Sequence, residues 1–364
     1  MSEAERLVPP SPERRAAQAV DALRHGWALD FAGGPVLLPV ETAIASGATS
    51  GHLLISAARA ATLKLINQLE AARNDLPHTP ILIRSGEAIT LDVARPIADP
   101  SLDLGNPLKG PFKAEPIGWP DEAVAAMEYA RIAGILPAFM VDPVAGGEPH
   151  PLIASDLAAY TDAGRLDIIT RARLPVKANE DAQIIAFRST ADTREHVALI
   201  IGEQSGDREP LVRLHSECLT GDVLGSLKCD CGPQLDAALE AMSEHARNDG
   251  GWGIMLYMRQ EGRGIGLINK LRAYRLQDQG FDTVEANERL GLPDEARDFP
   301  VAARMLELIG AKSIRLLTNN PAKVKSLEAT GIRVSERVHH QLPDNPHNAH
   351  YLATKRDRSG HLLK

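Results

Sequence analysis

Apolar positions along this chain follow two alternating spacings, that of an amphipathic helix and that of a half-buried strand. Helical spacing covers residues 16–26, 121–134, 155–164, 233–248, 267–280, 301–311 and 321–331. Strand-like runs cover residues 35–40, 80–84, 182–189, 196–202, 251–260 and 313–318, and residues 52–73 predict a strand running into a helix. Strands that alternate with helices predict an α/β fold of mixed β-sheets layered with helices.

The same pattern predicts two domains that meet near residues 165–180. Residues 1–15 are polar and rich in proline, which predicts a mobile tail, and the Pro and Gly residues of 96–120 predict a loop region. Residues 171–181 are interpreted as the connection into a second domain, which opens with a hairpin of the runs 182–189 and 196–202. We therefore expect one domain over residues 16–171 and another over 172–364.

Composition limits the classes of partner. The chain of 364 residues has a formal net charge of -8, which argues against nucleic acid or a membrane surface as a broad partner, because both need a basic face. No apolar run approaches the roughly 20 residues that span a bilayer. The N-terminus has no apolar signal segment, and free thiols fit a reducing compartment, so we expect a cytoplasmic protein.

All three cysteines, Cys218, Cys229 and Cys231, fall within fourteen residues. An odd number of cysteines cannot close entirely into intramolecular disulfides, and three thiolates on a short loop suit Zn²⁺. Three protein ligands leave a fourth position for water, as in catalytic sites. His215 lies three residues before Cys218 and could instead complete a structural site. Spacing alone leaves both kinds of zinc site open.

Two glycine- or proline-containing turns predict contacts with an anion. EGRGIG, residues 261–266, leads from a predicted strand into a helix, and TNNPAK, residues 318–323, does the same. Lys323 in a first helical turn is best explained if it faces a phosphate, because the helix dipole there is positive. Arginines at predicted loop ends also fit a phosphorylated substrate; they are Arg213, Arg259, Arg263 and Arg297. Taken singly, each turn could be an ordinary connection and each cation a solvated side chain.

Together these motifs resemble a known family. The segments are RLHSECLTGDVLGSLKCDCGPQL, RQEGRGIGLINKLRAYRLQDQGFDTVEANERLG, RLLTNNPAKV and NAHYLATKRDRSGHLL. In this order they resemble GTP cyclohydrolase II over residues 172–364. The resemblance implies an enzyme that hydrolytically opens the imidazole ring of GTP. It would release formate and pyrophosphate and leave a diaminopyrimidinone ribosylamino phosphate, the entry step to riboflavin.

The resemblance also implies roles for individual residues. Cys218, Cys229 and Cys231 match the zinc ligands, one ion per chain, with water at the fourth position, and His215 becomes a neighbour. Tyr274 matches a tyrosine assigned to catalysis. Mg²⁺ is expected with the GTP phosphates. The positions that match GTP contacts are Arg213, Leu214, His215, Ser216, Glu217, Gln234, Glu261, Gly262, Arg263, Thr283, Thr318 and Lys323.

Two further positions depart from the family pattern or from simple chemistry. The family uses an arginine, here Arg297, as a nucleophile toward the α-phosphorus, although a protonated guanidinium is better suited to positioning phosphate. The family usually has an aspartate as proton acceptor two residues earlier. Here that position is Glu295, with Asp294 beside it, so either carboxylate could accept the proton.

The N-terminal half resembles 3,4-dihydroxy-2-butanone 4-phosphate synthase, mainly in its hydrophobic framework and in DEAVAAMEYARIAGILPAFMV. That family needs an acidic loop to hold Mg²⁺. The corresponding stretch here is PVETAIASGATSGHLL, whose only carboxylate is Glu41, and GWPDE replaces an expected histidine motif. We therefore expect a domain without synthase activity that serves packing, oligomerisation or regulation.

Two other functions stay open beside the leading one. The chain could be a catalytically impaired GTP-binding regulatory or scaffolding protein, although the complete cysteine triad, Tyr274 and Arg297 argue against this. It could also perform the same chemistry on a related purine nucleotide. The resemblance further implies a homodimer.

Overall fold

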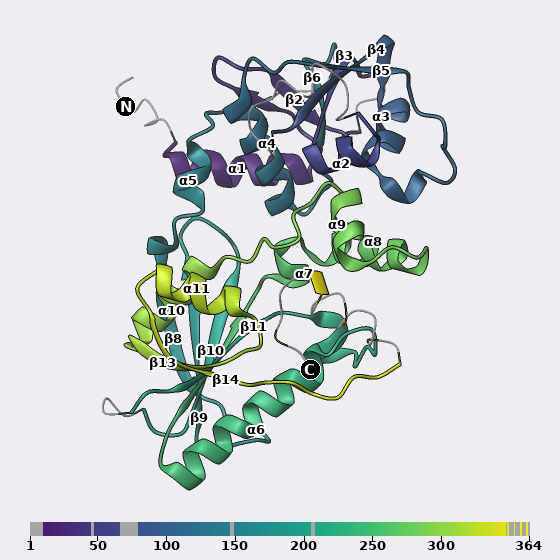
Figure 1. Cartoon of the computed structure of the whole chain (residues 1–364). Helices are drawn as coiled ribbons and strands as arrows, with labels where there is room; N and C mark the ends of the chain where they lie inside the picture. Colours follow the sequence, from purple (N-terminus) through teal and green to yellow (C-terminus); the bar gives the residue numbers. More distant parts are fainter. Residues whose placement is uncertain are drawn as a thin grey trace, which may run out of the picture. The chain divides into compact units, whose positions relative to one another are not determined.

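One seven-stranded sheet forms the centre of each of two units in the computed structural model (Figure 1). The structure describes residues 10–44, 47–65, 79–145, 149–204, 208–346, 348, 353, 357, 358 and 362. The N-terminal unit consists of Met1–Asp162, Ile268–Phe281 and Glu285–Asp294, and the C-terminal unit of Ala163–Leu267, Asp282–Val284 and Glu295–Lys364. Each sheet is mixed and layered with helices, which confirms the predicted α/β class.

The sheet of the N-terminal unit has the strand order β5-β4-β3-β6-β2-β1-β7, in which β1 and β7 pair in parallel and the other described neighbours pair antiparallel. The elements up to residue 160 are α1 (Pro12–Arg24), β1 (Leu29–Phe31), β2 (Val36–Pro39), β3 (Thr49–Ile55), α2 (Ala57–Thr62), β4 (Ile81–Thr90), α3 (Leu91–Ala98), η2 (Pro100–Leu102), β5 (Phe112–Glu115), α4 (Pro120–Ala133), β6 (Ala138–Val141), β7 (His150–Leu152) and α5 (Asp156–Tyr160). Apolar residues of β3, β4, β6 and α3 share one core cluster.

Several boundaries in this unit differ from the expected ones. Helix α1 begins at Pro12 rather than Ala16, because proline is well suited to the first helical turn and Arg15 is held by the carboxylate of Asp156 at 2.8 Å. Residues 1–9 of the expected tail lie outside the described residues, as do residues 66–73 of the segment expected to run from a strand into a helix. The expected loop over 96–120 contains η2 and the strand β5, which pairs with β4.

The sheet of the C-terminal unit has the order β14-β13-β11-β12-β10-β9-β8. Strands β11 to β14 pair in parallel and β8, β9, β10 and β12 pair antiparallel, so the predicted hairpin of β9 and β10 is confirmed. The elements from residue 163 onward are η3 (Ala163–Arg165), β8 (Leu166–Arg173), β9 (Ala182–Ser189), β10 (Glu195–Ile201), β11 (Leu211–Ser216), the π-helical turn η4 (Leu219–Val223), α6 (Cys231–Asp249), β12 (Gly253–Met258), α7 (Glu261–Gly264), α8 (Leu267–Asp278), α9 (Thr283–Arg289), α10 (Phe299–Ile309), β13 (Ser313–Leu317), α11 (Pro321–Ala329) and β14 (Arg333–Val338).

Helices cover both faces of this second sheet. Ile254 and Leu256 of β12 point into a core with residues of α10 and α11, whereas Met255 points into a second core with Met242 of α6. This alternation is what a strand buried on both faces requires. Among the described residues, no helix is long and apolar enough to cross a membrane.

Candidate active site

The candidate site residues of the C-terminal unit gather where parallel strands end. Strand β11 leads into the cysteine loop, β12 into the EGRGIG turn and β13 into the TNNPAK turn. Because these three strands pair in parallel, their carboxyl ends meet at one edge of the sheet. In open α/β sheets, ligands bind in the crevice at such an edge.

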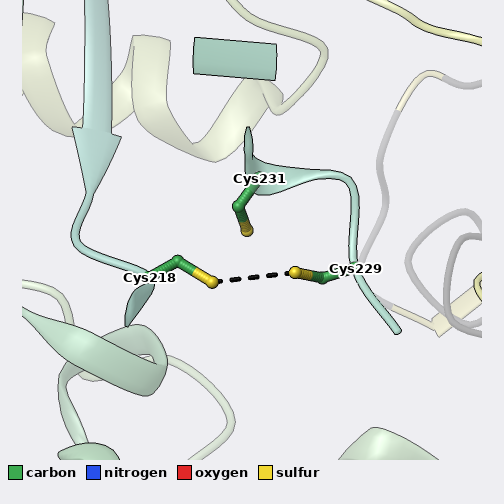
Figure 2. Close-up of side chains that lie close together, drawn as sticks. All are labelled: Cys218, Cys229 and Cys231. Carbon is green, nitrogen blue, oxygen red and sulfur yellow. Dashed lines mark hydrogen bonds between the residues drawn. The ribbon is translucent and has the colours of Figure 1, made fainter. Parts of the chain in front are cut away.

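The three cysteines face one another at this edge (Figure 2). Their sulfur atoms all lie within 4.8 Å of one another, and the Cys218 and Cys229 sulfurs are 3.6 Å apart. A tetrahedral Zn²⁺ with bonds of about 2.3 Å places its sulfur ligands about 3.8 Å apart, so the spacing fits this ion. Among the described residues, the cluster of metal-ligating atoms consists of these three thiols.

The close contact of the thiols depends on Gly221 in η4. A Cβ at this position would lie 2.8 Å from the Cys229 sulfur and 3.0 Å from the Cys218 sulfur. The Gly221 amide also donates a hydrogen bond to the Cys218 sulfur at 3.3 Å. Hydrogen bonding to Cys218 and burial raise the pKa of Cys229, although hydrogen bonding to Cys231 acts to lower it. The pKa of Cys231 is raised further, by hydrogen bonding to both other thiols and by burial. A bound cation would favour the deprotonated thiolates and so offset these rises in pKa.

Asp222 organises the cysteine loop from behind. Its carboxylate accepts hydrogen bonds from the Cys218 amide at 3.0 Å and from the Tyr257 hydroxyl at 2.9 Å. His215 Nε2 lies 3.0 and 3.1 Å from the two carboxylate oxygens, and the His215 ring stacks on Tyr257. Burial and the bond to Asp222 raise the pKa of Tyr257, so its hydroxyl remains a donor. His215 therefore lies beside the triad with this nitrogen directed to a carboxylate.

Glu261 also supports the cysteine loop. One carboxylate oxygen accepts from the Leu219 amide at 2.7 Å and the other from the Gly262 amide at 3.0 Å. Glu217 follows β11 and accepts from Arg259 Nε at 2.8 Å. The EGRGIG and cysteine loops are thus joined through charged side chains.

Arg213 lies on β11 and is almost fully buried. Its guanidinium donates to the Leu317 carbonyl at 3.0 Å and to the Gln234 side chain, and burial lowers its pKa to about 10. The Gln234 carbonyl accepts from His340 Nε2 at 3.0 Å. Burial, followed by the charge of Arg213, lowers the pKa of His340 to about 4. The structure therefore brings Arg213 and Gln234 together beside a neutral histidine.

The EGRGIG segment forms a tight turn. Ala296, which lies between Glu295 and Arg297, contacts this turn. Gly262 and Arg263 have positive φ, and a Cβ on Gly264 would lie 2.3 Å from the Ala296 carbonyl oxygen. The Ala296 amide donates to the Arg263 carbonyl at 3.1 Å. This packing requires glycine at position 264, and it explains why EGRGIG is a turn before α8.

Glu295 and Arg297 form an ion pair. Arg297 Nε lies 2.7 Å from a Glu295 carboxylate oxygen, and the Arg297 amide donates to the same oxygen at 3.0 Å. Burial acts to raise the pKa of Glu295, but the hydrogen bonds and charge of Arg297 outweigh it and leave the pKa lowered. The carboxylate is therefore ionised, and its ion pair with Arg297 makes it a weaker base than an ordinary glutamate.

Thr318 and Lys323 are the first and last residues of the TNNPAK turn. Lys323 is buried in α11, and its ammonium donates to the Leu214 carbonyl at 2.9 Å. Thr318 follows β13 and is 2% exposed, and its hydroxyl accepts from the Asn320 amide at 3.0 Å. Both residues are thus fixed at the sheet edge that carries the cysteine loop.

Two predicted residues lie on the helices that follow the EGRGIG turn. Thr283 opens α9 within the C-terminal unit, whereas Tyr274 is on α8 within the N-terminal unit. The Lys270 ammonium lies 5.7 Å from the centre of the Tyr274 ring. The place of Tyr274 relative to the thiols stays a prediction.

Three residues that support the site escaped the sequence analysis. Asp222 and Tyr257 hold the cysteine loop, and Gln260 exchanges hydrogen bonds with the backbone of Asp298. The position of Asp222 four residues after Cys218 could have indicated this role, because a carboxylate in a short loop commonly accepts a hydrogen bond from a nearby backbone amide. Tyr257 and Gln260 gave no such signal, since their partners are distant in sequence.

Comparison with known proteins gives one family model, GTP cyclohydrolase II, which matches residues 167–339. A GTP cyclohydrolase-2 of Azospirillum brasilense is 39% identical over 324 residues, which are 85% of this chain and 81% of that protein. A riboflavin biosynthesis protein RibBA of Salinispora tropica is 45% identical over 259 residues, covering 66% of this chain and 63% of its own length.

Two further proteins are similar to this chain, one over a shorter stretch and one at low sequence identity. A RibBA protein of Bacillus cereus is 54% identical over 179 residues, covering 49% of this chain and 44% of that protein. A solved structure titled RibBX, a two-domain 3,4-dihydroxy-2-butanone 4-phosphate synthase from A. baumannii, covers 90% of this chain and 100% of its own. Its TM-score is 0.31 at 15% identity.

Proposed function

We propose that this chain, which belongs to the GTP cyclohydrolase II family, hydrolytically opens the guanine imidazole ring of GTP and releases formate and pyrophosphate. The product would be a diaminopyrimidinone ribosylamino phosphate, the starting compound of riboflavin biosynthesis. The observation that carries the proposal is the triad of cysteine sulfurs within 4.8 Å of one another at the carboxyl ends of parallel strands.

Cys218, Cys229 and Cys231 would hold one Zn²⁺ per chain, and their sulfur chemistry and spacing fit that ion. A zinc ion held by three protein ligands supplies a Lewis acid and lowers the pKa of water at its open position. Mg²⁺ would accompany the GTP phosphates and neutralise their charge.

The residues of the chain would bind GTP and move a proton. Glu295 is ionised beside Arg297, so we assign it the proton acceptor, with Asp294 as the alternative. For Arg297 we favour contact with the phosphates, because a protonated guanidinium is a poor nucleophile. Tyr274 would act in catalysis.

The remaining predicted residues would bind the substrate. Arg263 and Lys323 supply charge for the triphosphate, whereas Glu261 and Gln234 suit the guanine edge or ribose. In the structure Glu261 accepts two backbone amides, so binding guanine would require these contacts to be shared or exchanged. The other proposed contacts are Arg213, Leu214, His215, Ser216, Glu217, Gly262, Thr283 and Thr318.

The first experiment incubates zinc-loaded protein with GTP and Mg²⁺ and follows formate and pyrophosphate, in parallel with Cys229→Ser. We expect both products from the wild type and no formate from the variant. Pyrophosphate without formate from the wild type would indicate that ring opening is lost, and binding of GTP without turnover would favour a regulatory protein. Equal turnover of ATP would contradict the guanine assignment.

For the N-terminal unit we propose the absence of synthase activity. The carboxylate of Glu41 is engaged by Arg272 at 2.8 Å and by the Leu136 amide at 2.7 Å, which leaves little capacity for a metal ion. We expect purified protein supplied with ribulose 5-phosphate and Mg²⁺ to form no dihydroxybutanone phosphate. Its appearance above the rate of a heat-denatured control would contradict this assignment.

The family resemblance also implies a cytoplasmic homodimer. Light scattering of the purified protein measures its molar mass and so tests whether it is a dimer.

A further inference from the structure

Gln260 lies between β12 and the EGRGIG turn and is almost completely buried, at 3% exposed. Its side-chain amide contacts the backbone of Asp298 through both of its groups. The Gln260 carbonyl oxygen accepts from the Asp298 amide at 3.1 Å, and the Gln260 NH₂ group donates to the Asp298 carbonyl at 3.4 Å. The two residues are 38 positions apart and belong to the C-terminal unit. A buried glutamine that bonds one residue in both directions holds two chain segments in a fixed register.

The backbone of Arg297 is anchored on both sides. On one side, the Ala296 amide donates to the Arg263 carbonyl at 3.1 Å, and a Cβ on Gly264 would lie 2.3 Å from the Ala296 carbonyl oxygen. On the other side is Asp298, which is held as described above and also caps α10. Loss of either anchor would free one end of the backbone that carries the Arg297 side chain.

The Arg297 guanidinium makes contacts within its own segment. Its Nε lies 2.7 Å from a Glu295 carboxylate oxygen, and its Cζ lies 5.6 Å from the centre of the Phe299 ring. Both partners are two residues away along the chain, so these contacts move with the backbone of the segment. The place of the guanidinium relative to the sheet edge therefore depends on the anchors at Ala296 and Asp298.

The anchored segment faces the residues of the candidate site in the same unit. Glu261, the neighbour of Gln260 in the chain, accepts from the Leu219 amide of the cysteine loop at 2.7 Å. Burial is the main cause that lowers the pKa of Arg213 to about 10, and the charge of Arg297 acts in the same direction. The contact made by Gln260 therefore joins the Arg297 segment to the turn that holds the cysteine loop.

We propose that Gln260 is a positioning residue for the cyclohydrolase reaction, which holds the Arg297 guanidinium and the paired Glu295 carboxylate in place through the backbone of Asp298. This inference rests on the proposed function. Gln260 would touch neither GTP nor metal, because its amide is directed to Asp298, and would act only through the segment that it anchors.

The test compares Gln260→Met with Gln204→Met in the full-length, zinc-loaded protein. Methionine is similar to glutamine in length and packs well in a buried position, but it cannot donate a hydrogen bond and is a weak acceptor. Gln204 is the matched control, because its side chain donates to the Ile309 carbonyl at 2.9 Å, at the opposite end of α10. We expect Gln260→Met to lower kcat for formate release about tenfold, per bound zinc, with KM for GTP changed less than about threefold. Gln204→Met should leave both constants at the wild-type values.

Two kinetic and binding readouts separate positioning from a general loss of structure. The amount of zinc bound per chain should be the same in Gln260→Met as in the wild type, because the contact of Glu261 with the cysteine loop is retained. In an Arg297→Lys background, adding Gln260→Met should cause little further loss of kcat, because both changes act on the same group.

Hydrogen exchange tests the anchor itself and needs no turnover. The Asp298 amide should exchange about tenfold faster in Gln260→Met than in Gln204→Met. Gln260→Asn keeps a buried amide that is one methylene shorter, so it should reach at most one of the two Asp298 groups. We expect this variant to give intermediate values of both kcat and exchange, and it serves if methionine prevents folding.

The outcomes distinguish this inference from the proposed function. A kcat and an Asp298 exchange rate in Gln260→Met equal to those of Gln204→Met would overturn the positioning role while the wild type still releases formate. A full additional loss of rate in the Arg297→Lys background, or a loss of zinc from Gln260→Met, would also overturn it. Conversely, a wild type that releases no formate would overturn the proposed function, and faster Asp298 exchange in Gln260→Met would then show a purely structural anchor.

Discussion

At the scale of single residues, the cysteine loop depends on the carboxylate of Asp222, which lies outside the cluster of the three thiols. Asp222 accepts the Cys218 amide and the Tyr257 hydroxyl and faces His215, so it fixes the backbone at the first cysteine. All of these partners are buried or partly buried, which makes an unpaired donor costly. Groups behind a metal ligand commonly set its orientation in this way.

We therefore predict that Asp222→Asn weakens zinc binding. The Cys218 amide and the Tyr257 hydroxyl donate to the same carboxylate oxygen, so an asparagine oxygen that keeps both of them turns the NH₂ donor toward His215 Nε2, and the opposite orientation leaves both without an acceptor. The loss of affinity should be about 10-fold to 100-fold, measured by competition with a chromogenic chelator. Asp236→Asn, an exposed change in the first turns of α6, is the matched control and should bind zinc as the wild type does. Equal affinities in the two variants would show that the loop holds its shape without Asp222.

At the scale of elements, the sequence predicts those whose burial follows a regular period. The helices α6 and α10 and the strands β9, β10 and β12 were expected because one or both of their faces are apolar. Strand β11 was not expected, since Arg213 and His215 interrupt its apolar pattern although both are buried. Their burial is supported by Leu317, Gln234 and Asp222, which no local pattern reveals. Strand β14 lies at the edge of the sheet and is mostly exposed, so its sequence carries no apolar pattern.

At the scale of the whole molecule, local sequence patterns could not predict that most of α8 and α9 belongs to the N-terminal unit. The contact between Glu41 and Arg272 joins residues 231 positions apart, and it assigns part of the expected C-terminal segment to the N-terminal unit. The clustering of the three cysteines could be predicted, because they are close in sequence and their chemistry is distinctive. Proposed roles for Tyr274 and Arg297 came from family resemblance instead, since tyrosine and arginine are common on ordinary surfaces.

The stability of the C-terminal unit should depend on pH through His196. This buried residue of β10 accepts the Arg259 amide at Nδ1 over 3.0 Å, and burial lowers its pKa from 6.5 to about 4. The unfolded chain therefore binds the proton more tightly than the folded chain between these two values. The contribution of His196 to stability is fully present above the unfolded pKa and is lost as pH falls toward the folded pKa.

Between about pH 7.5 and about pH 5, this one group should cost about 2 kcal/mol of unfolding free energy. His196→Asn keeps an acceptor near the position of Nδ1 but cannot be protonated, so its stability should fall less over the same interval. Urea unfolding of both proteins at each pH measures the difference, and the other titrating groups, including the cysteine thiols, cancel in that comparison. Identical pH dependence in the two proteins would mean that His196 does not control acid stability. Loss of the Arg259 contact on protonation would also disturb the segment leading into EGRGIG, so at low pH the wild type should lose its fold near the site before the variant does.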